Sequence, residues 1–94
     1  MFVDSNQQYT GVIRNIVYTL TRKSDNASVV YNTMSDTVAS FSDQYITVEK
    51  SNNVDGFKIT MDTVMPSTAQ HYELEAVINY ISGKTQTVST NIVV

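Results

Sequence analysis

Apolar and polar positions alternate most clearly over the last part of the chain, from residue 72 to residue 94. On both sides of the turn-forming segment Ser82-Gly83-Lys84, every second position is mostly apolar; these positions include Tyr72, Leu74, Ala76, Ile78, Tyr80, Val88, Ile92 and Val94. Side chains of a β-strand point alternately to its two faces. A period of two that continues through a turn therefore predicts a long β-hairpin with one buried face.

The apolar positions also predict how the two strands of this hairpin pair. Leu74 opposite Ile92, and Ile78 opposite Val88, sets apolar side chains against one another. A slip by one residue would move a whole face to the wrong side of the sheet. The preferred register leaves an odd-numbered loop around Gly83, as a three-residue hairpin loop requires.

Upstream of the hairpin, the same pattern predicts further short strands separated by polar turns. We expect strands over residues 12–22, 28–34, 44–49 and 57–61, while residues 35–42 fit either helical spacing or a short edge strand. With the hairpin, this makes six or seven strands and no segment in which a helical pattern prevails. The chain is therefore predicted to be a single all-β domain over residues 1–94, an antiparallel β-sandwich of about seven strands.

Two sheets packed face to face would bury one side of each strand. The expected core consists of Ile16, Tyr18, Leu20, Val30, Ile46, Val48, Phe57, Ile59, Leu74, Ala76, Ile78, Val88 and Ile92. The composition agrees with sheet, because thirteen Val, twelve Thr and seven Ile stand against only two Leu. Branched side chains of this kind suit a pleated surface and lose rotamer freedom in a helix.

The second half of the chain resembles the immunoglobulin-like sandwich. The segment Val64-Met65-Pro66 precedes Tyr72-Glu73-Leu74, and Gly83 follows. In that family a Tyr at the start of a late strand bonds through its hydroxyl to backbone a few residues upstream, forming a tyrosine corner. The resemblance implies this role for Tyr72, with Pro66 in the turn. The chain departs from the antibody pattern in having no Cys and no Trp, and its hairpin also resembles cysteine-free relatives of the fibronectin type III kind.

Charge and composition exclude several classes of partner. The net charge is -3, with six basic and nine acidic residues, and only Arg22 and Lys23 are adjacent cations. Nucleic-acid binding needs clustered Lys and Arg, so no nucleic-acid partner is expected. Without Cys there is neither a disulfide nor a thiolate metal site. No apolar run approaches the roughly 20 residues of a membrane span, and we expect a virion or cytoplasmic protein without a membrane partner.

Candidate chemistry is sparse. The single histidine, His71, is expected to be an ordinary loop residue, because no nucleophile and base are arranged around it. The loop aspartates lack the spacing of a calcium loop, so neither an enzyme nor a metal or cofactor site is expected. Tyr9 and Tyr45 are the tyrosines expected to be exposed. With an Asp-bearing loop, they support an alternative interpretation as a carbohydrate-binding or adhesion module.

Association with other proteins is the interpretation that the pattern favours. Val77 and Ile81 interrupt the polar face of the hairpin, and strand edges and apolar outer patches are surfaces through which proteins add neighbours. The predicted contact residues are Phe2, Val77, Ile81, Val93, Asn52, Asn53 and Asp55.

In its Thr-, Ser-, Asn- and Val-rich, cysteine-free and acidic composition, the chain resembles small immunoglobulin-like virion proteins of tailed phages. That resemblance implies a non-enzymatic structural module in capsid decoration, the head–tail region or the baseplate. Its partners would be other protein subunits, a second copy of the chain among them.

Overall fold

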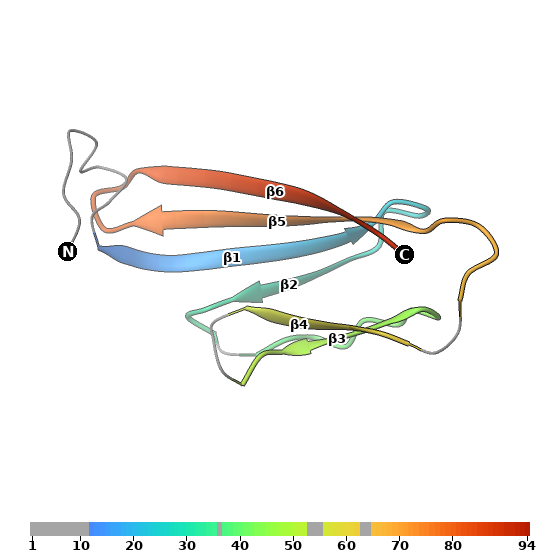
Figure 1. Cartoon of the computed structure of the whole chain (residues 1–94). Helices are drawn as coiled ribbons and strands as arrows, with labels where there is room; N and C mark the ends of the chain where they lie inside the picture. The colour runs from blue at the N-terminus through green and yellow to red at the C-terminus, as the bar shows by residue number, and fades with distance from the viewer. Residues whose placement is uncertain (1–11, 36, 53–55, 63–64) are drawn as a thin grey trace.

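A computed structural model describes residues 12–35, 37–52, 56–62 and 65–94, and these residues form six β-strands and no helix. The strands are β1 (Ile13–Arg22), β2 (Ser28–Asn32), β3 (Ile46–Lys50), β4 (Phe57–Met61), β5 (His71–Tyr80) and β6 (Thr85–Val93). They build a four-stranded antiparallel sheet in the order β2-β1-β5-β6 and a two-stranded antiparallel sheet of β3 and β4 (Figure 1). The predicted all-β class is confirmed.

The prediction of about seven strands is too high for the described residues. The doubtful stretch 35–42 contributes only a single antiparallel bridge, between Val38 and Tyr31 of β2. One edge of β2 pairs with β1, and this bridge lies on the other, outer edge of β2.

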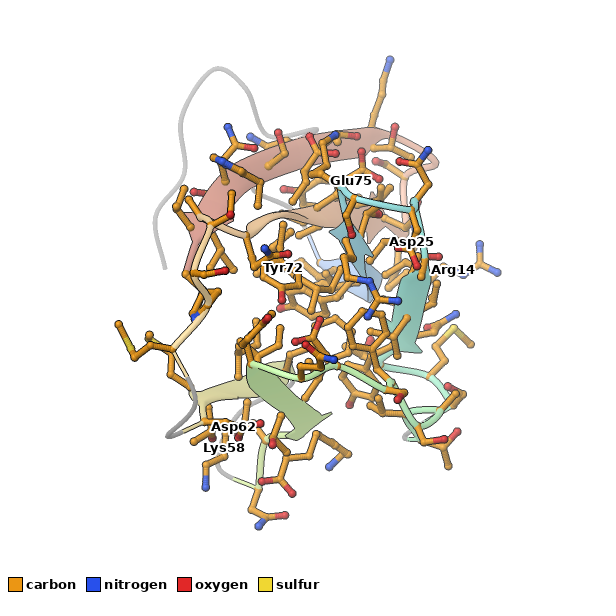
Figure 2. The ribbon with its side chains drawn as sticks, turned by 90° about the vertical axis from the view of Figure 1, so that its right-hand side faces the viewer. Arg14, Asp25, Lys58, Asp62, Tyr72 and Glu75 are labelled. Atoms are coloured by element: carbon orange, nitrogen blue, oxygen red, sulfur yellow. The ribbon has the colours of Figure 1, made fainter. Side chains whose placement is uncertain are left out.

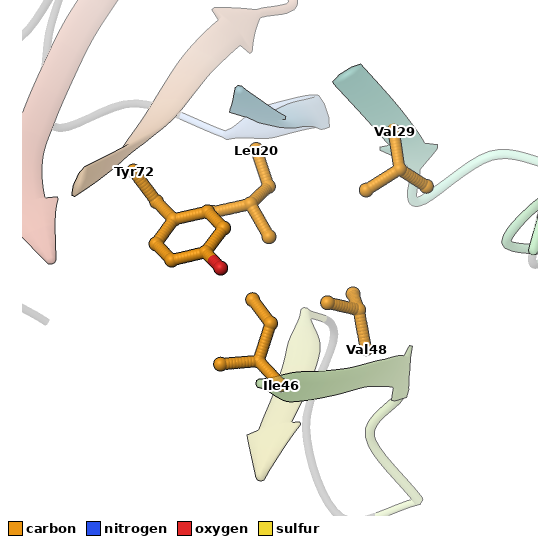
Figure 3. Packing of buried hydrophobic residues seen from close by; sticks show 5 residues of the cluster. All are labelled: Leu20, Val29, Ile46, Val48 and Tyr72. Atoms are coloured by element: carbon orange, nitrogen blue, oxygen red, sulfur yellow. The ribbon is translucent and has the colours of Figure 1, made fainter. Parts of the chain in front are cut away.

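The two sheets face each other across a small core. Leu20, Val29 and Tyr72 project from the larger sheet toward Ile46 and Val48 of β3 (Figure 3). The β3–β4 sheet covers only part of the larger one, and the ends of β1, β5 and β6 near the β5–β6 turn extend beyond it (Figure 1). The described part of the chain is thus two sheets thick at one end and a single sheet at the other.

Three aromatic rings extend this core along the larger sheet. Tyr18 of β1 and Tyr31 of β2 lie side by side with ring centroids 6.2 Å apart and an interplanar angle of 10°. Phe57 of β4 is tilted against both rings at the same centroid distance. Offset aromatic pairs at this separation stabilise a core beyond their buried area alone.

Two members of the expected core are exposed. Val30 is 47% exposed, because Leu20 pairs with Val29 across the β1–β2 hairpin and this register turns Val29 and Tyr31 inward instead. Val88 is 52% exposed although it lies on the expected face. It belongs to the edge strand β6, next to Ala76 of β5, beyond the cover of the smaller sheet.

The register predicted for the terminal hairpin is wrong by two residues. Tyr72 pairs with Ile92 and Leu74 with Thr90, so the buried face is as expected but each pair is displaced. The loop has three residues: the Gly83 N–H bonds to the Tyr80 carbonyl at 2.9 Å, and the Tyr80 N–H to the Lys84 carbonyl at 3.0 Å. Gly83, at φ +93°, is the last loop residue rather than its centre, because this type of loop needs a left-handed residue there.

Candidate functional site

The carboxylate of Asp43, just before β3, accepts four hydrogen bonds from described residues. Its Oδ1 accepts hydrogen bonds from the backbone N–H groups of Tyr45 and Ile46 at 2.8 and 3.1 Å. Its Oδ2 accepts from the Tyr72 hydroxyl at 2.8 Å and from Arg22 Nη1 at 3.2 Å. The Asp43 side chain is 2% exposed. One buried carboxylate therefore ties β1 and β5 of the larger sheet to the start of β3.

Arg22, the last residue of β1, completes this cluster. Its Nε and Nη2 donate to the two carboxylate oxygens of Asp25 at 2.9 and 2.8 Å, and Nη1 also donates to the Ser42 carbonyl at 2.7 Å. The guanidinium lies 5.2 Å from the centroid of the Phe41 ring, within the range of a cation–π contact. Arg22 thus holds the β1–β2 turn and the segment before β3 together.

Electrostatics in the cluster favour the charged carboxylates and the neutral tyrosine. Burial alone would raise the pKa of Asp43, but hydrogen bonds from Tyr45, Tyr72 and Arg22 outweigh it and hold that pKa below its usual value. The bidentate bond from Arg22 lowers the pKa of Asp25 to about 2. Burial, followed by the bond to Asp43, raises the pKa of Tyr72 to about 12. At neutral pH the cluster is one cation, two anions and a neutral phenol.

The cluster borders an open depression of about 390 Å³ at the thick end of the molecule. Its lining includes Tyr45, Gln44, Gln70, Ser24 and Asp25. In Figure 2, Asp25 lies beside the β1–β2 turn, and Tyr72 points from β5 toward the smaller sheet. The depression is polar, and it is lined by one aromatic ring and by amide, hydroxyl and carboxylate groups.

The chemistry available at this cluster is structural. Both oxygens of Asp43 already accept two hydrogen bonds each from the protein, so no lone pair remains directed at a substrate or a metal ion. His71 is exposed and makes no side-chain hydrogen bond to a described residue. Over the residues that the structure covers, no group of three or more His, Cys, Asp or Glu side chains could hold a metal ion.

Tyr72 is buried at 1% exposure, as the tyrosine-corner prediction requires, but its hydroxyl has another partner. It donates to the Asp43 side chain, 29 positions upstream, rather than to backbone near Pro66. The predicted backbone bond is therefore wrong, and Pro66 is a half-buried residue of the β4–β5 connection. The sequence marks Asp43 only as a turn aspartate, and nothing in its spacing signals a contact with Tyr72 or Arg22.

A second depression, also of about 390 Å³, lies where β1 begins and the β5–β6 hairpin turns. Its lining includes Arg14, Lys84 and three asparagines, Asn15, Asn32 and Asn79, and no acidic residue from the described part of the chain. Asn15 is 8% exposed and donates to Asn32 Oδ1 at 3.1 Å. A β-bulge between Ile13 and Asn15 displaces Arg14 from the regular ladder of β1.

The predicted contact residues do not gather into one patch. Val77 is half-buried on the outer face of the larger sheet, between Val17 of β1 and Thr87 of β6. Ile81 is 67% exposed in the hairpin loop, and Val93 is 59% exposed at the opposite end of β6. Asn52 is exposed in the β3–β4 loop. The remaining predicted contact residues, Phe2, Asn53 and Asp55, lie outside the described part of the chain. So does Tyr9, one of the two tyrosines considered for sugar binding.

The described residues contain no helix that is long and apolar enough to cross a membrane. A scan against protein-family models found no match, and searches of the curated proteins and of the solved structures found none either.

Proposed function

We propose that this chain is a non-enzymatic assembly module that works through protein–protein contacts. The observation that carries this function is a series of exposed apolar side chains along the border of the larger sheet, which we call the apolar rim: Val12, Ile13, Ile81, Val88 and Val93. The Ile81 N–H bonds to the Val12 carbonyl at 3.0 Å, and Ile13 pairs with Tyr80. Val12, Ile13 and Ile81 are therefore neighbours at the hairpin end, and Val88 and Val93 lie farther along β6.

The exposure of these side chains is large. Val12 and Ile81 are 68% and 67% exposed, and Val88 on β6 is 52% exposed. Single exposed apolar residues are ordinary, whereas neighbouring ones mark contact surfaces. Covering them would contribute roughly 25 cal/mol per Å² of apolar area, before the cost of association. A partner that lies along this rim would cover these side chains.

The strand arrangement supports an immunoglobulin-like kind of sandwich. In that fold one sheet carries strands C′, C, F and G side by side, and strands D and E belong to the other sheet. The order β2-β1-β5-β6 with a separate β3–β4 pair matches C′-C-F-G with D and E, and the chain order of the strands also agrees. Tyr72, buried at the start of β5, occupies the position of the conserved Tyr in strand F. The comparison covers strands C to G.

The composition supports a place for this module in the virion of a tailed phage, as capsid decoration, head–tail or baseplate protein. Such a role needs a rigid body with contact surfaces and no reactive centre. Antibodies raised against the chain would label purified particles under this proposal, and particles with no bound antibody would refute the virion assignment.

A double substitution in the rim tests the assembly function. Ile81→Ser with Val88→Ser removes two exposed apolar side chains, and Met61→Ser with Met65→Ser, at positions 59% and 74% exposed on or beside the smaller sheet, is the matched control. Light scattering over a range of protein concentrations measures the solution mass of each variant. We expect the rim variant to associate less than the control. Equal association of the two variants would contradict the proposal.

Carbohydrate binding is the second candidate function, and the depression beside Tyr45 favours it. Tyr45, which is half-buried rather than exposed as expected, lines this depression together with Asp25 and Asp43. Aromatic faces with a few polar groups are typical of small-molecule sites. A glycan array with and without calcium, repeated with Tyr45→Ala, tests this function. Saturable binding that the substitution abolishes would favour it over assembly.

A further inference from the structure

The edge strand β6 has nine residues, and no other described strand pairs with its outer border. It carries no charged residue, no Pro and no bulge along Thr85–Val93, and all of its side chains are exposed except the half-buried Ile92. Natural edge strands are usually short or carry Lys, Pro or a bulge, because an unprotected edge pairs with other strands. β6 has none of these protections.

Hydrogen bonding alternates along β6, and this alternation defines which backbone groups are free. Gln70 and Val94 exchange both of their N–H···O bonds at 3.0 and 2.9 Å, and the Tyr80 N–H bonds to Lys84 at 3.0 Å. Even-numbered residues therefore face β5. The N–H and C=O groups of the odd-numbered residues point away from β5 and have no partner among the described residues; these residues are Thr85, Thr87, Ser89, Asn91 and Val93.

The opposite edge of the same sheet is protected. β2 has five residues, half the length of β1, and the Val38 bridge to Tyr31 covers its outer side. Beyond β2, β1 has a β-bulge at Ile13 and Asn15 in its pairing with β5, and a bulge bends and twists the strand that carries it. Strand addition at the β2 edge is therefore hindered, and among the described strands of this sheet only β6 offers a long regular ladder at an edge.

From these observations we infer that β6 pairs antiparallel with β6 of a second copy of this chain, joining two four-stranded sheets into one. This inference rests on the assembly function proposed above and names the partner. The register with the longest overlap places Ser89 opposite Ser89 of the second copy, Thr87 opposite Asn91, and Thr85 opposite Val93. In this register each odd-numbered residue lies opposite an odd-numbered residue of the second copy. The outward N–H and C=O groups of one strand therefore face the outward C=O and N–H groups of the other.

The side chains next to the junction are compatible with this pairing. On the core face, Val88 lies opposite Thr90 of the second copy and diagonal to the second Val88, within reach of side-chain contact. The pairing therefore covers a valine that is 52% exposed in the single chain. Glu75 neighbours Ser89 on β5. The two copies of Glu75 would be three strand spacings apart, about 14 Å, where salt screens their repulsion.

The geometry limits this assembly to two copies. A two-fold axis through Ser89 uses the β6 edge of both chains in the same contact, which closes the interface. The protected β2 edges then form the two borders of the eight-stranded sheet. A closed pair, rather than an open fibre, is the product that the two edges together allow.

Single-cysteine crosslinking tests the register directly, since the native chain has no Cys. Directly opposite residues that exchange backbone bonds have Cα atoms about 5.5 Å apart, within the range of a disulfide. Ser89→Cys should therefore form a disulfide-linked dimer under mild oxidation. Thr87→Cys is the matched control, because two copies of Thr87 would lie about 13 Å apart along the strands. A mixture of Thr87→Cys and Asn91→Cys chains should crosslink again.

The outcomes separate this inference from the proposed function. Crosslinking of Ser89→Cys and of the mixed pair, but not of Thr87→Cys alone, supports the β6 contact. Solution masses above that of one chain without crosslinking at Ser89 would overturn the β6 pairing and leave the assembly function standing. A monomer that shows no crosslink and binds sugar saturably would overturn both. Thermal unfolding by circular dichroism verifies that each variant remains folded.

Discussion

Removal of the Tyr72 hydroxyl tests the connection between the two sheets. In Tyr72→Phe the ring remains in the core, where the native side chain is 1% exposed, and only the 2.8 Å bond to Asp43 Oδ2 is lost. A hydrogen bond to a charged group contributes about 1.5–3 kcal/mol. Asp43 keeps its bonds from Tyr45, Ile46 and Arg22. We therefore expect a loss of about 2 kcal/mol in the free energy of unfolding.

Urea unfolding at neutral pH, followed by far-ultraviolet circular dichroism, measures this loss. With a slope of about 1 kcal/mol per M for a chain of this size, the midpoint should fall by about 2 M. Tyr80→Phe is the matched control, because the Tyr80 hydroxyl donates to the uncharged Gln86 Oε1 at 3.1 Å. Its midpoint should fall by about half as much or less. Equal midpoints for native protein and Tyr72→Phe would refute the role of Asp43 as the joint between the sheets.

The remaining predictions concern pH, a turn and an outer face. Asp43 has a lowered pKa in the folded state. Its contribution to the free energy of unfolding is therefore present above an unfolded pKa of about 3.9 and is lost as the pH falls through the folded pKa. In this acidic range, the melting temperature of Asp43→Asn should vary less with pH than that of the native protein. Tyr72, with its pKa raised from 10.0 to about 12, contributes stability that is present below pH 10 and lost as the pH rises toward 12; ultraviolet titration should show a late tyrosinate signal that is absent in Tyr72→Phe. Gly83→Ala should lower the free energy of unfolding by about 1–2 kcal/mol, because Gly83 has φ +93°, a backbone conformation that a side chain disfavours. Among the described residues, Gly56→Ala meets ordinary contacts with the Tyr18 ring and should change the urea midpoint little. Val77→Asp, on the outer face and outside both the apolar rim and the β6 edge, should leave the chain folded by circular dichroism, and an unfolded variant would show that Val77 belongs to the core.

Much of the fold could be predicted from the sequence because period-two patterns respond directly to a buried face. Residues 57–61 match β4 over its whole length, and Leu20, Ile46 and Val48 are buried as expected. The face of β5 was also predicted. Its offset against β6 was not, because displacement by two residues leaves every side chain on the same face. Gly83 at the end of the loop, rather than its centre, determines this offset.

The polar cluster could not be predicted, because its members come from three separate parts of the chain. Arg22 ends β1, Asp43 precedes β3 and Tyr72 opens β5. Each residue has an ordinary local explanation, and only the packing of the sheets brings the three together. Exposure of Val88 was missed for a related reason: the alternation along β6 indicates a face, but it does not show how far the smaller sheet covers that face.

Amide hydrogen exchange along β6, measured by nuclear magnetic resonance at high and low protein concentration, tests the assembly account most directly. The even-numbered amides bond to β5 and should be protected at both concentrations. The account predicts that the amides of Thr87, Ser89 and Asn91 are protected at high concentration and exchange rapidly on dilution, as the second strand leaves. Rapid exchange of these three amides at every concentration would contradict pairing through β6.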